Sequence, residues 1–179
     1  MKGNIKRILD HYKRLKSRVD EVRKALGRPM TLTEKTIYSH LKIPEKINKQ
    51  VFDFSEIEII PDHLAMEEQI AQMVFSQHSL MRPKQPNLST SVHLNTFPQA
   101  LDAPHPILTA YSQQYGIDIW NSAAGTMEQA SLEQYAFPGG LLIGSSPHMA
   151  NLGGLGVLAL EAGDGDSLLS LSGFALKMA

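Results

Sequence analysis

The 179-residue sequence predicts an α/β fold: a mainly parallel sheet with flanking helices and an N-terminal amphipathic helix. Three observations lead to this class. Apolar residues recur at helical spacing through the first 26 residues, and short apolar runs further along have the length of buried strands. Helical and strand-like segments then alternate over the second half, which is typical of helices that connect parallel strands.

The first predicted helix is amphipathic and basic. Its apolar side chains are spaced by three and four residues along one face, and these are Ile5, Ile8, Tyr12, Leu15, Val19, Val22 and Leu26. Gly27 and Pro29 end the helix, because glycine accepts a left-handed cap and proline cannot continue the hydrogen-bond ladder. Residues 1–26 hold nine Lys/Arg against three Asp/Glu. We interpret the basic face as solvated, with contact to nucleic acid or an acidic membrane as alternatives.

The remaining elements are predicted from caps, apolar runs and chain breakers. Strands are expected at VFDFSEIEII (51–60), GIDIW (116–120) and GLLIG (140–144). Helices are expected over 31–41 behind the capping box TLTE, from Asp62 as cap to about Gln77, over 105–115 and 126–136, and over 154–179 with a break at Gly163–Gly165 and an Asp166 cap. Residues 81–106 are expected to be mostly irregular, because prolines stand at 83, 86, 98, 104 and 106.

Composition excludes several classes of protein. No apolar run reaches the roughly 18 residues of a membrane span, and the N-terminus lacks the apolar core of a secretory signal. The chain has no cysteine, which excludes disulfides, thiolate zinc sites and an iron–sulfur cluster held by this chain alone. Residues 85–176 contain seven Asp/Glu and no Lys or Arg, so this part offers no cationic side chain to an anionic substrate.

The glycines of NLGGLG could bring backbone amides to a phosphate, but the pattern matches neither a phosphate-binding loop nor a dinucleotide fingerprint. We expect Gly153, Gly154 and Gly156 to serve close packing of a helix against a strand.

Two other patterns carry weak signals. Ser145, Ser146 and His148 do not form the elbow of a serine hydrolase, and a serine and a histidine so close in sequence rarely meet in the required geometry. No metal site is predicted, because His93, His105 and His148 lack metal-ligand spacing.

Three ordered segments carry a resemblance to a known family. They are VRKALGRPMTLTEKTIYSHL (22–41), IIPDHLAMEEQIAQMV (59–74) and LEQYAFPGGLLIGSSPHMANLGGLG (132–156). They resemble the opening region of mitochondrial-type aconitase, aconitate hydratase, from about residue 8 to the end. The resemblance implies a partial aconitase-like first domain, with an N-terminal helical segment over 1–50 and a truncated aconitase-like α/β domain over 51–179.

The resemblance also implies a chemistry. Aconitases are lyases of the tricarboxylic acid cycle that interconvert citrate and isocitrate through cis-aconitate, using a 4Fe–4S cluster whose exposed iron binds the substrate. The family's cluster cysteines, substrate arginines and serine base belong to stretches that would follow residue 179. No cofactor is therefore expected in this chain, and a tricarboxylate is expected as a ligand only through the resemblance.

Several family site positions carry other residues here. A glutamine, an Asp–His pair, a histidine and an Asp–Ser pair of the family correspond to Glu67, Asn95 and Thr96, Glu128, and Ser146 and Pro147. Of the family's substrate-contacting side chains, His148 and Asn151 remain. Asparagine and threonine cannot exchange protons near neutral pH, and an added carboxylate repels a tricarboxylate. No catalytic residue is predicted.

We therefore interpret the chain as an aconitase-like fragment that is catalytically inactive by itself, a pseudoenzyme. One alternative is a lyase subunit that works when another chain supplies the iron–sulfur cluster. A second is an RNA-binding or protein-interaction remnant, because cytosolic family members without their cluster bind RNA and the first helix is basic. The resemblance implies a mitochondrial location, or a cytoplasmic one if no presequence is present.

Overall fold

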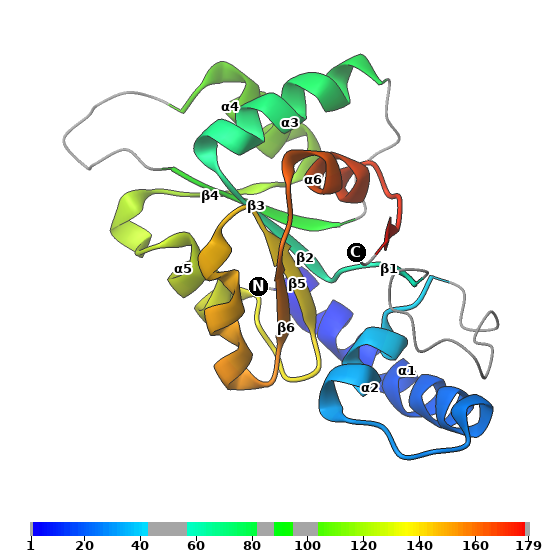
Figure 1. The fold of residues 1–179 in the computed structure, drawn as a ribbon. Helices are drawn as coiled ribbons and strands as arrows, with labels where there is room; N and C mark the ends of the chain where they lie inside the picture. The colour runs from blue at the N-terminus through cyan, green and yellow to red at the C-terminus, as the bar shows by residue number, and fades with distance from the viewer. Residues whose placement is uncertain (1, 43–56, 82–87, 95–103, 178–179) are drawn as a thin grey trace.

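The computed structural model describes residues 2–42, 57–81, 88–94 and 104–177. A five-stranded sheet of order β4-β3-β2-β5-β6 forms its centre (Figure 1), and every pairing within it is parallel. Its strands are β2 (His63–Glu67), β3 (Ser89–His93), β4 (Asp118–Trp120), β5 (Leu141–Gly144) and β6 (Leu158–Glu161). A separate antiparallel pair joins β1 (Glu58–Ile59) to β7 (Leu176–Lys177). The predicted α/β class is confirmed.

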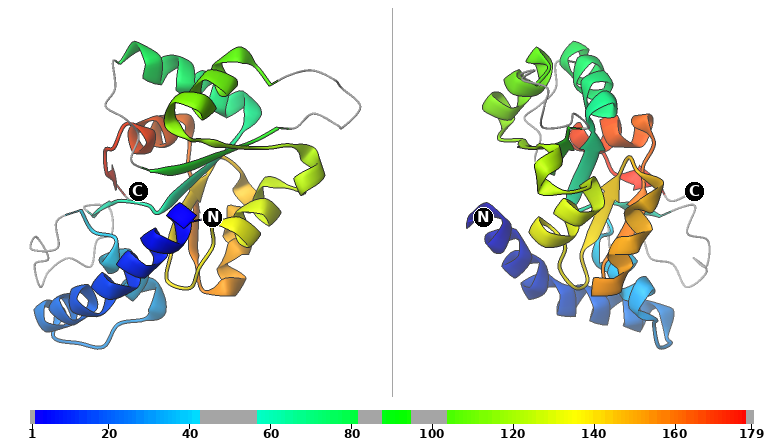
Figure 2. Two further views of the ribbon diagram at one scale, coloured as in Figure 1. Left: turned by 180° about the vertical axis from the view of Figure 1, so that it is seen from behind. Right: turned by 90° about the vertical axis from the view of Figure 1, so that its left-hand side faces the viewer.

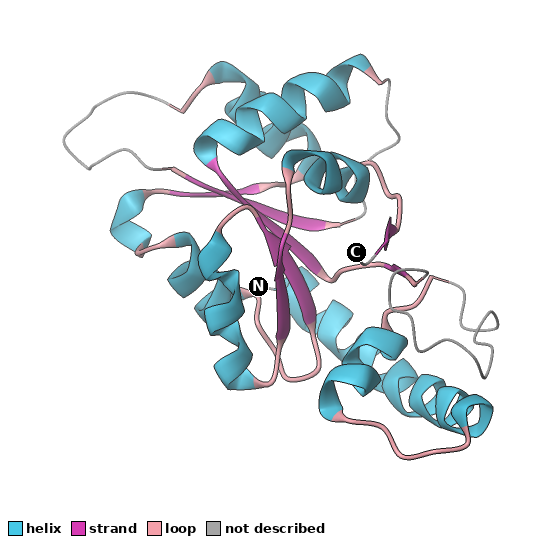
Figure 3. Ribbon diagram, viewed as in Figure 1, coloured by secondary structure: helices cyan, strands magenta, loops and turns pink. Residues whose placement is uncertain are grey.

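Helices cover both faces of the sheet. The α-helices are α1 (Lys2–Leu26), α2 (Leu32–Ser39), α3 (Glu68–Leu80), α4 (Pro106–Tyr115), α5 (Met127–Gln134) and α6 (Asp164–Leu171), and the 3-10 helices are η3 (Ser122–Ala124) and η4 (Pro147–Leu155). Figure 3 shows α3, α4 and α6 on one side of the strands and α5 and η4 on the other, with α1 and α2 at one end. None of the described helices combines the length and apolarity of a membrane-spanning segment.

Alternation along the strands divides the buried side chains between two cores. Leu64 and Met66 of β2 belong to the core beneath α3 and α6, whereas Ala65 between them belongs to the core beneath α5 and η4. Successive strand residues point to opposite faces, so a strand covered on both sides needs apolar residues at every position. The run LLIG of β5 is accordingly buried throughout.

The predicted helix from Asp62 to Gln77 is wrong over its first turn and a half. Residues 63–67 form β2, which pairs with β3 on one side and β5 on the other, and α3 begins only at Glu68. The cause is tertiary: Leu64, Ala65 and Met66 are fully buried as a central strand. A run of three apolar residues is too short to distinguish a strand from a helix by periodicity.

Three further strands were not predicted. One is β7, because Leu176–Lys177 falls in the helix expected over 154–179 but pairs with β1. β3 lies inside the stretch expected to be irregular, and its sequence STSVH becomes a strand by pairing with both β2 and β4. β6 replaces the first half of the helix expected over 154–179, because Leu158–Glu161 pairs along β5. The helix that follows begins at Asp164 with Gly163, not Asp166, as its cap.

The locally encoded elements are confirmed. α1, α4, β4, α5 and β5 lie where the sequence predicts them, and Gly27 ends α1 with a φ of 66°. The capping box is complete, since Glu34 N–H donates to the Thr31 hydroxyl at 3.2 Å and Thr31 N–H donates to the Glu34 carboxylate at 2.7 Å. Hydrogen bonds from Arg28 and from Thr31 hold the pKa of Glu34 at about 2.

Only part of the strand predicted at 51–60 can be compared with the structure. Residues 58–59 form β1, while residues 51–56 and the predicted domain boundary at residue 50 lie outside the described residues.

The expected role of the NLGGLG glycines is wrong at two positions. A Cβ added to Gly153 or Gly154 would meet no heavy atom within 4 Å, so neither serves close packing. Gly156 ends η4 with a φ of 72°, which favours glycine. The close approach is at Gly144 of β5, where an added Cβ would lie 2.7 Å from Sδ of the fully buried Met149.

We predict that Gly144→Ala lowers the free energy of unfolding by about 1–3 kcal/mol, because the new methyl group would force Met149 out of a closely packed position. Gly153→Ala is the matched control and should change stability little. Urea denaturation of the two variants measures the difference, and equal stabilities would show that the contact between Gly144 and Met149 imposes no constraint.

Candidate functional site

The topology places a reversal of strand order at the carboxyl ends of β2 and β5. β3 and β4 extend the sheet on one side of β2, and β5 and β6 extend it on the other, so the direction of strand succession reverses between β2 and β5. In open α/β sheets, ligands bind outside the carboxyl ends of the strands at such a reversal. The residues at this point are Glu67 at the end of β2 and the turn Ser145–His148 after β5. We call this place the carboxyl edge.

Hydrogen bonds join the two strand ends at the carboxyl edge. The main-chain N–H of Glu67 donates to the Ser145 hydroxyl at 2.9 Å, and the main-chain N–H of Ser145 donates to the Ala65 carbonyl at 3.1 Å. Ser145 therefore fixes the turn against the end of β2, and its hydroxyl is committed to the backbone.

Ser146 and Glu128 form the central polar contact of the edge. The Ser146 hydroxyl is buried and donates to the carboxylate of Glu128 on α5. It also accepts a hydrogen bond from the main-chain N–H of His148 at 3.2 Å. Burial alone would raise the pKa of Glu128, but the hydrogen bond from Ser146, with smaller contributions including nearby His148, lowers it overall. Glu128 is thus an ionised carboxylate at neutral pH.

The structure brings together only some of the site residues that the sequence predicts. Glu67, Glu128 and Ser146 converge at the carboxyl edge, and Pro147 occupies the first turn of η4, where its missing N–H is not needed. His148 and Asn151 follow on the same 3-10 helix and are exposed. Asn95 and Thr96 lie outside the described residues.

His93, which the resemblance implies as a family position, ends β3, and its ring is hydrogen-bonded back along that strand. Its Nε2 is 3.0 Å from the Ser91 hydroxyl, which is also 3.0 Å from Nε2 of His63, and Nδ1 of His63 is 3.0 Å from the Ser89 hydroxyl. Burial lowers the pKa of His63 to about 3 and that of His93 to about 4. Both rings are neutral and serve the hydrogen-bonded row between β2 and β3.

An aromatic layer supports this row. The ring of Tyr135 stacks on His63 with centroids 3.7 Å apart. Its hydroxyl donates to the Asp118 carboxylate at 2.6 Å and accepts from Nε1–H of Trp120 at 2.9 Å. Burial and the contact with Asp118 raise the pKa of Tyr135, so the hydroxyl keeps its proton. Sequence reasoning missed His63 and Tyr135, because nothing local marks residues that meet only across paired strands.

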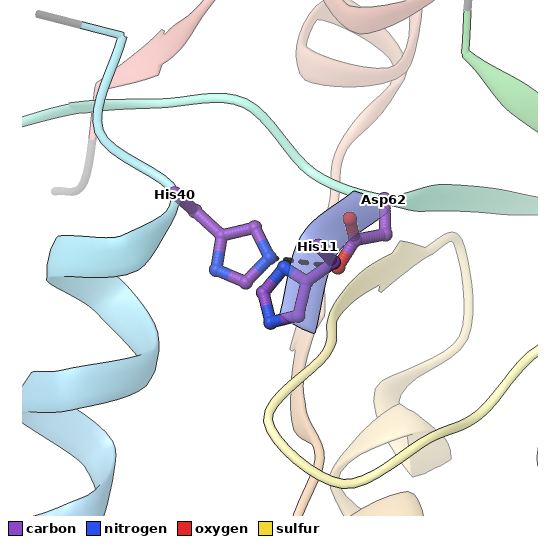
Figure 4. Close-up of side chains that lie close together, drawn as sticks. All are labelled: His11, His40 and Asp62. Carbon is purple, nitrogen blue, oxygen red and sulfur yellow. Dashed lines mark hydrogen bonds and ion pairs between the residues drawn. The ribbon is translucent and has the colours of Figure 1, made fainter. Parts of the chain in front are cut away.

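A second cluster lies at the opposite end of β2. His11, His40 and Asp62 present possible metal-ligand atoms within 4.8 Å of one another (Figure 4). His40 Nε2 is 2.7 Å from Asp62 Oδ2, its Nδ1 is 2.7 Å from the Thr36 carbonyl, and its ring stacks on His11. Sequence analysis missed the cluster because its members come from three separate segments.

The geometry of this cluster fits a structural hydrogen-bond network better than a metal centre. Asp62 Oδ2 already accepts from His40 and from the Leu141 main-chain N–H at 3.0 Å. Burial lowers the pKa of His11, the Asp62 carboxylate partly offsets this, and the neighbouring His40, Arg14 and Arg18 lower it further. The positive charges of Arg14 and Arg18 would oppose a bound cation. The histidines considered from sequence contribute nothing here: His105 caps α4, and His148 lies on η4.

Comparison with known proteins decides the family. The family model described as the aconitase family (aconitate hydratase) matches residues 34–179. The chain belongs to the aconitase family. The carboxyl edge described above therefore belongs to an aconitase-family sheet.

Relatives of known name support the assignment. The chain is 31% identical over 173 residues to mitochondrial aconitate hydratase of Schizosaccharomyces pombe, covering 88% of this chain and 22% of the relative. It is 32% identical over 171 residues to the mitochondrial enzyme of Gracilaria gracilis, with 88% and 22% covered, and 32% identical over 186 residues to that of Aspergillus fumigatus, with 94% and 23% covered. The chain spans less than a quarter of the length of these relatives.

The buried histidines predict acid sensitivity. In the folded chain the pKa values of His63 and His93 lie below 6.5, the ordinary value expected for the unfolded chain. The unfolded state therefore binds more protons than the folded state as the pH falls below about 6.5. The contribution of the two neutral histidines to the free energy of unfolding is fully present above pH 6.5 and is lost as the pH falls toward 4. We expect a loss on the order of 1–2 kcal/mol per histidine between pH 7 and pH 5.

Urea denaturation at several pH values measures this loss. His63→Gln should flatten the dependence between pH 7 and pH 5 relative to the parent chain, because one of the two groups no longer titrates. An unchanged slope in that variant would contradict the assignment of the acid sensitivity to the row beneath the edge.

Proposed function

We propose that this chain is a catalytically inactive part of the aconitase family, which keeps the family's sheet as a scaffold. The observation that carries the proposal is the contact between Ser146 and Glu128 at the carboxyl edge. An ionised carboxylate and a committed hydroxyl occupy the place where the family resemblance implies a histidine and an aspartate.

Electrostatics at the edge support the proposal. Glu67 and Glu128 both belong to the carboxyl edge, and residues 85–176 contain no Lys or Arg that could compensate their charges. The substrate class that the resemblance implies carries three carboxylates. Like charges close together disfavour binding, and no guanidinium of this half is present to pair with a carboxylate.

Proton transfer is the second argument. A general acid or base needs both a suitable pKa and a free proton-accepting atom within reach of the substrate. The ring of His93 is neutral and its Nε2 is hydrogen-bonded to Ser91. The Glu128 carboxylate accepts a hydrogen bond from the Ser146 hydroxyl. His148 is the one described imidazole exposed at the edge, and it stands without the acid and serine that the family pattern places beside it.

The family's 4Fe–4S cluster does not fit the residues of this chain. Such clusters are held by cysteine thiolates, and none of the 179 residues is cysteine. The described donors at the carboxyl edge are carboxylates, hydroxyls and an imidazole. We infer that this chain holds no cluster by itself, so an active form would need thiolates from another chain.

Reconstitution tests the proposal directly. After incubation with ferrous iron and sulfide, we expect no cluster absorption in the visible range and no hydration of cis-aconitate above the buffer rate. A mitochondrial aconitate hydratase treated in parallel is the positive control. A cluster band together with turnover by this chain would overturn the proposal.

A complementation arm separates inactivity from the subunit alternative. The remainder of the Schizosaccharomyces pombe relative, without the region this chain matches, supplies the missing length. The unmodified chain should not restore hydration, because the edge residues are wrong for it; restored hydration would establish the subunit alternative. The matched variant combines Glu67→Gln, Asn95→Asp, Thr96→His, Glu128→His, Ser146→Asp and Pro147→Ser, and it should restore more activity than the parent chain.

The names of the relatives also suggest a compartment. Because these relatives are mitochondrial enzymes, we propose a mitochondrial location for the protein that contains this chain. Imaging of that protein with a C-terminal fluorescent tag should show overlap with a mitochondrial marker, and a uniform cytoplasmic signal would contradict it.

A further inference from the structure

A cavity of about 480 Å³ lies at the amino-terminal end of β2, at the opposite end of the strand from the carboxyl edge. Its walls come from α1, from the end of α2, from Ile60–Asp62 before β2, and from the turn after α6. The two views of Figure 2 show α1 running along this end of the molecule. A volume of this size is in the range of small-molecule sites. We call it the basic cavity.

One stripe of α1 gives the basic cavity its charge. Arg7, His11, Arg14 and Arg18 are spaced by four, three and four residues, so they share one face of the helix, and all four line the cavity. Lys42 lines it from beyond α2. His11 of this stripe is buried and Arg18 is half-buried, whereas Arg7 and Arg14 stay exposed to solvent.

Two of these guanidinium groups keep donors available for a ligand. Nε–H of Arg14 donates to the Asp10 carbonyl at 3.1 Å, and Nη1–H of Arg18 donates to the Ser39 carbonyl at 2.5 Å. Among the described residues, neither forms an ion pair with a carboxylate. Burial lowers the pKa of Arg18, and the positive charge of Arg14 lowers it further.

The carboxylates of the cavity wall are engaged elsewhere. Asp62 binds His40 and the Leu141 main-chain N–H, and the Asp10 carboxylate faces Lys13 at 3.5 Å. Among the described residues no carboxylate forms an ion pair with Arg14 or Arg18, although nearby Glu21 offsets part of the lowering of the Arg18 pKa. A bound anion would provide the compensating charge.

We propose that the basic cavity binds a small phosphorylated molecule, with its phosphate on Arg14 and Arg18 and its organic part against Phe174. A phosphate group offers several oxygens and up to two charges to neighbouring guanidiniums. The ring of Phe174 lines the cavity and is 55% exposed, and Leu41 and Ile60 add apolar wall. A half-open pocket with an apolar side favours a small molecule over the backbone of RNA, which needs an extended basic surface.

Calorimetric titration of the full chain with phenyl phosphate tests this assignment. Arg14→Gln should weaken binding by about tenfold or more, which is the loss expected for one charge-assisted hydrogen bond. Arg23→Gln is the matched control, because Arg23 lies on the same helix, pairs with Asp20 at 3.0 Å and does not line the basic cavity. This control should bind within about twofold of the parent chain, since the charge it removes is outside the site.

Arg14 is the preferred position because its hydrogen bond stays within α1, so its replacement does not release a tertiary contact. Circular dichroism on heating confirms that the variant remains folded. Phe174→Ala should weaken phenyl phosphate but leave inorganic phosphate unchanged, which separates recognition of the organic part from recognition of the anion.

Three outcomes would overturn the proposal. The first is that the parent chain binds neither phenyl phosphate nor inorganic phosphate at millimolar concentration. The second is that Arg14→Gln binds as tightly as the parent chain. The third is that Arg23→Gln weakens binding as much as Arg14→Gln, which would indicate a diffuse basic surface. Structured RNA in the same assay identifies that last case, since it would respond equally to both substitutions. None of these outcomes depends on whether the carboxyl edge is active.

Discussion

The carboxylate of Asp62 is the contact on which the arrangement of the chain depends. It stands immediately before β2 and accepts from His40 at the end of α2 and from the main-chain N–H of Leu141 at the start of β5, while its own N–H donates to the Leu141 carbonyl at 2.8 Å. Burial alone would raise the pKa of Asp62, but these hydrogen bonds lower it overall. The ionised carboxylate of Asp62 therefore joins the end of α2 to the central strands β2 and β5.

The register that follows from this contact extends to the far ends of the same strands. Because β2 and β5 are parallel, their alignment at Asp62 also places Glu67 beside Ser145, where a hydrogen bond joins the two carboxyl ends. Packing along the strands is the family scaffold, with Gly144 kept small by Met149. At the end of that scaffold, Ser145 and Ser146 hydrogen-bond to Glu67 and Glu128.

The two ends of β2 consequently differ in charge. Carboxylates from Glu67 and Glu128 mark the carboxyl edge, whereas guanidiniums from Arg14 and Arg18 line the basic cavity at the amino end. The segregation comes from the chain itself, since the N-terminal helix is basic and the second half has no Lys or Arg until residue 177. Any anion that this chain binds is therefore expected at the end opposite the family site.

The sequence by itself determined the elements whose cause is local: the stripe of α1 and its Gly27 cap, the capping box at Thr31, and the short apolar strand of β5. It also pointed to the family, since three ordered segments resemble it. Tertiary structure alone decided that residues 63–67, STSVH and LALE are strands, because hydrogen bonds to partners far along the chain outweigh their weak local preference. It alone brought together His11, His40 and Asp62, and His63 with Tyr135, because side chains from separate segments meet only when the sheet has formed.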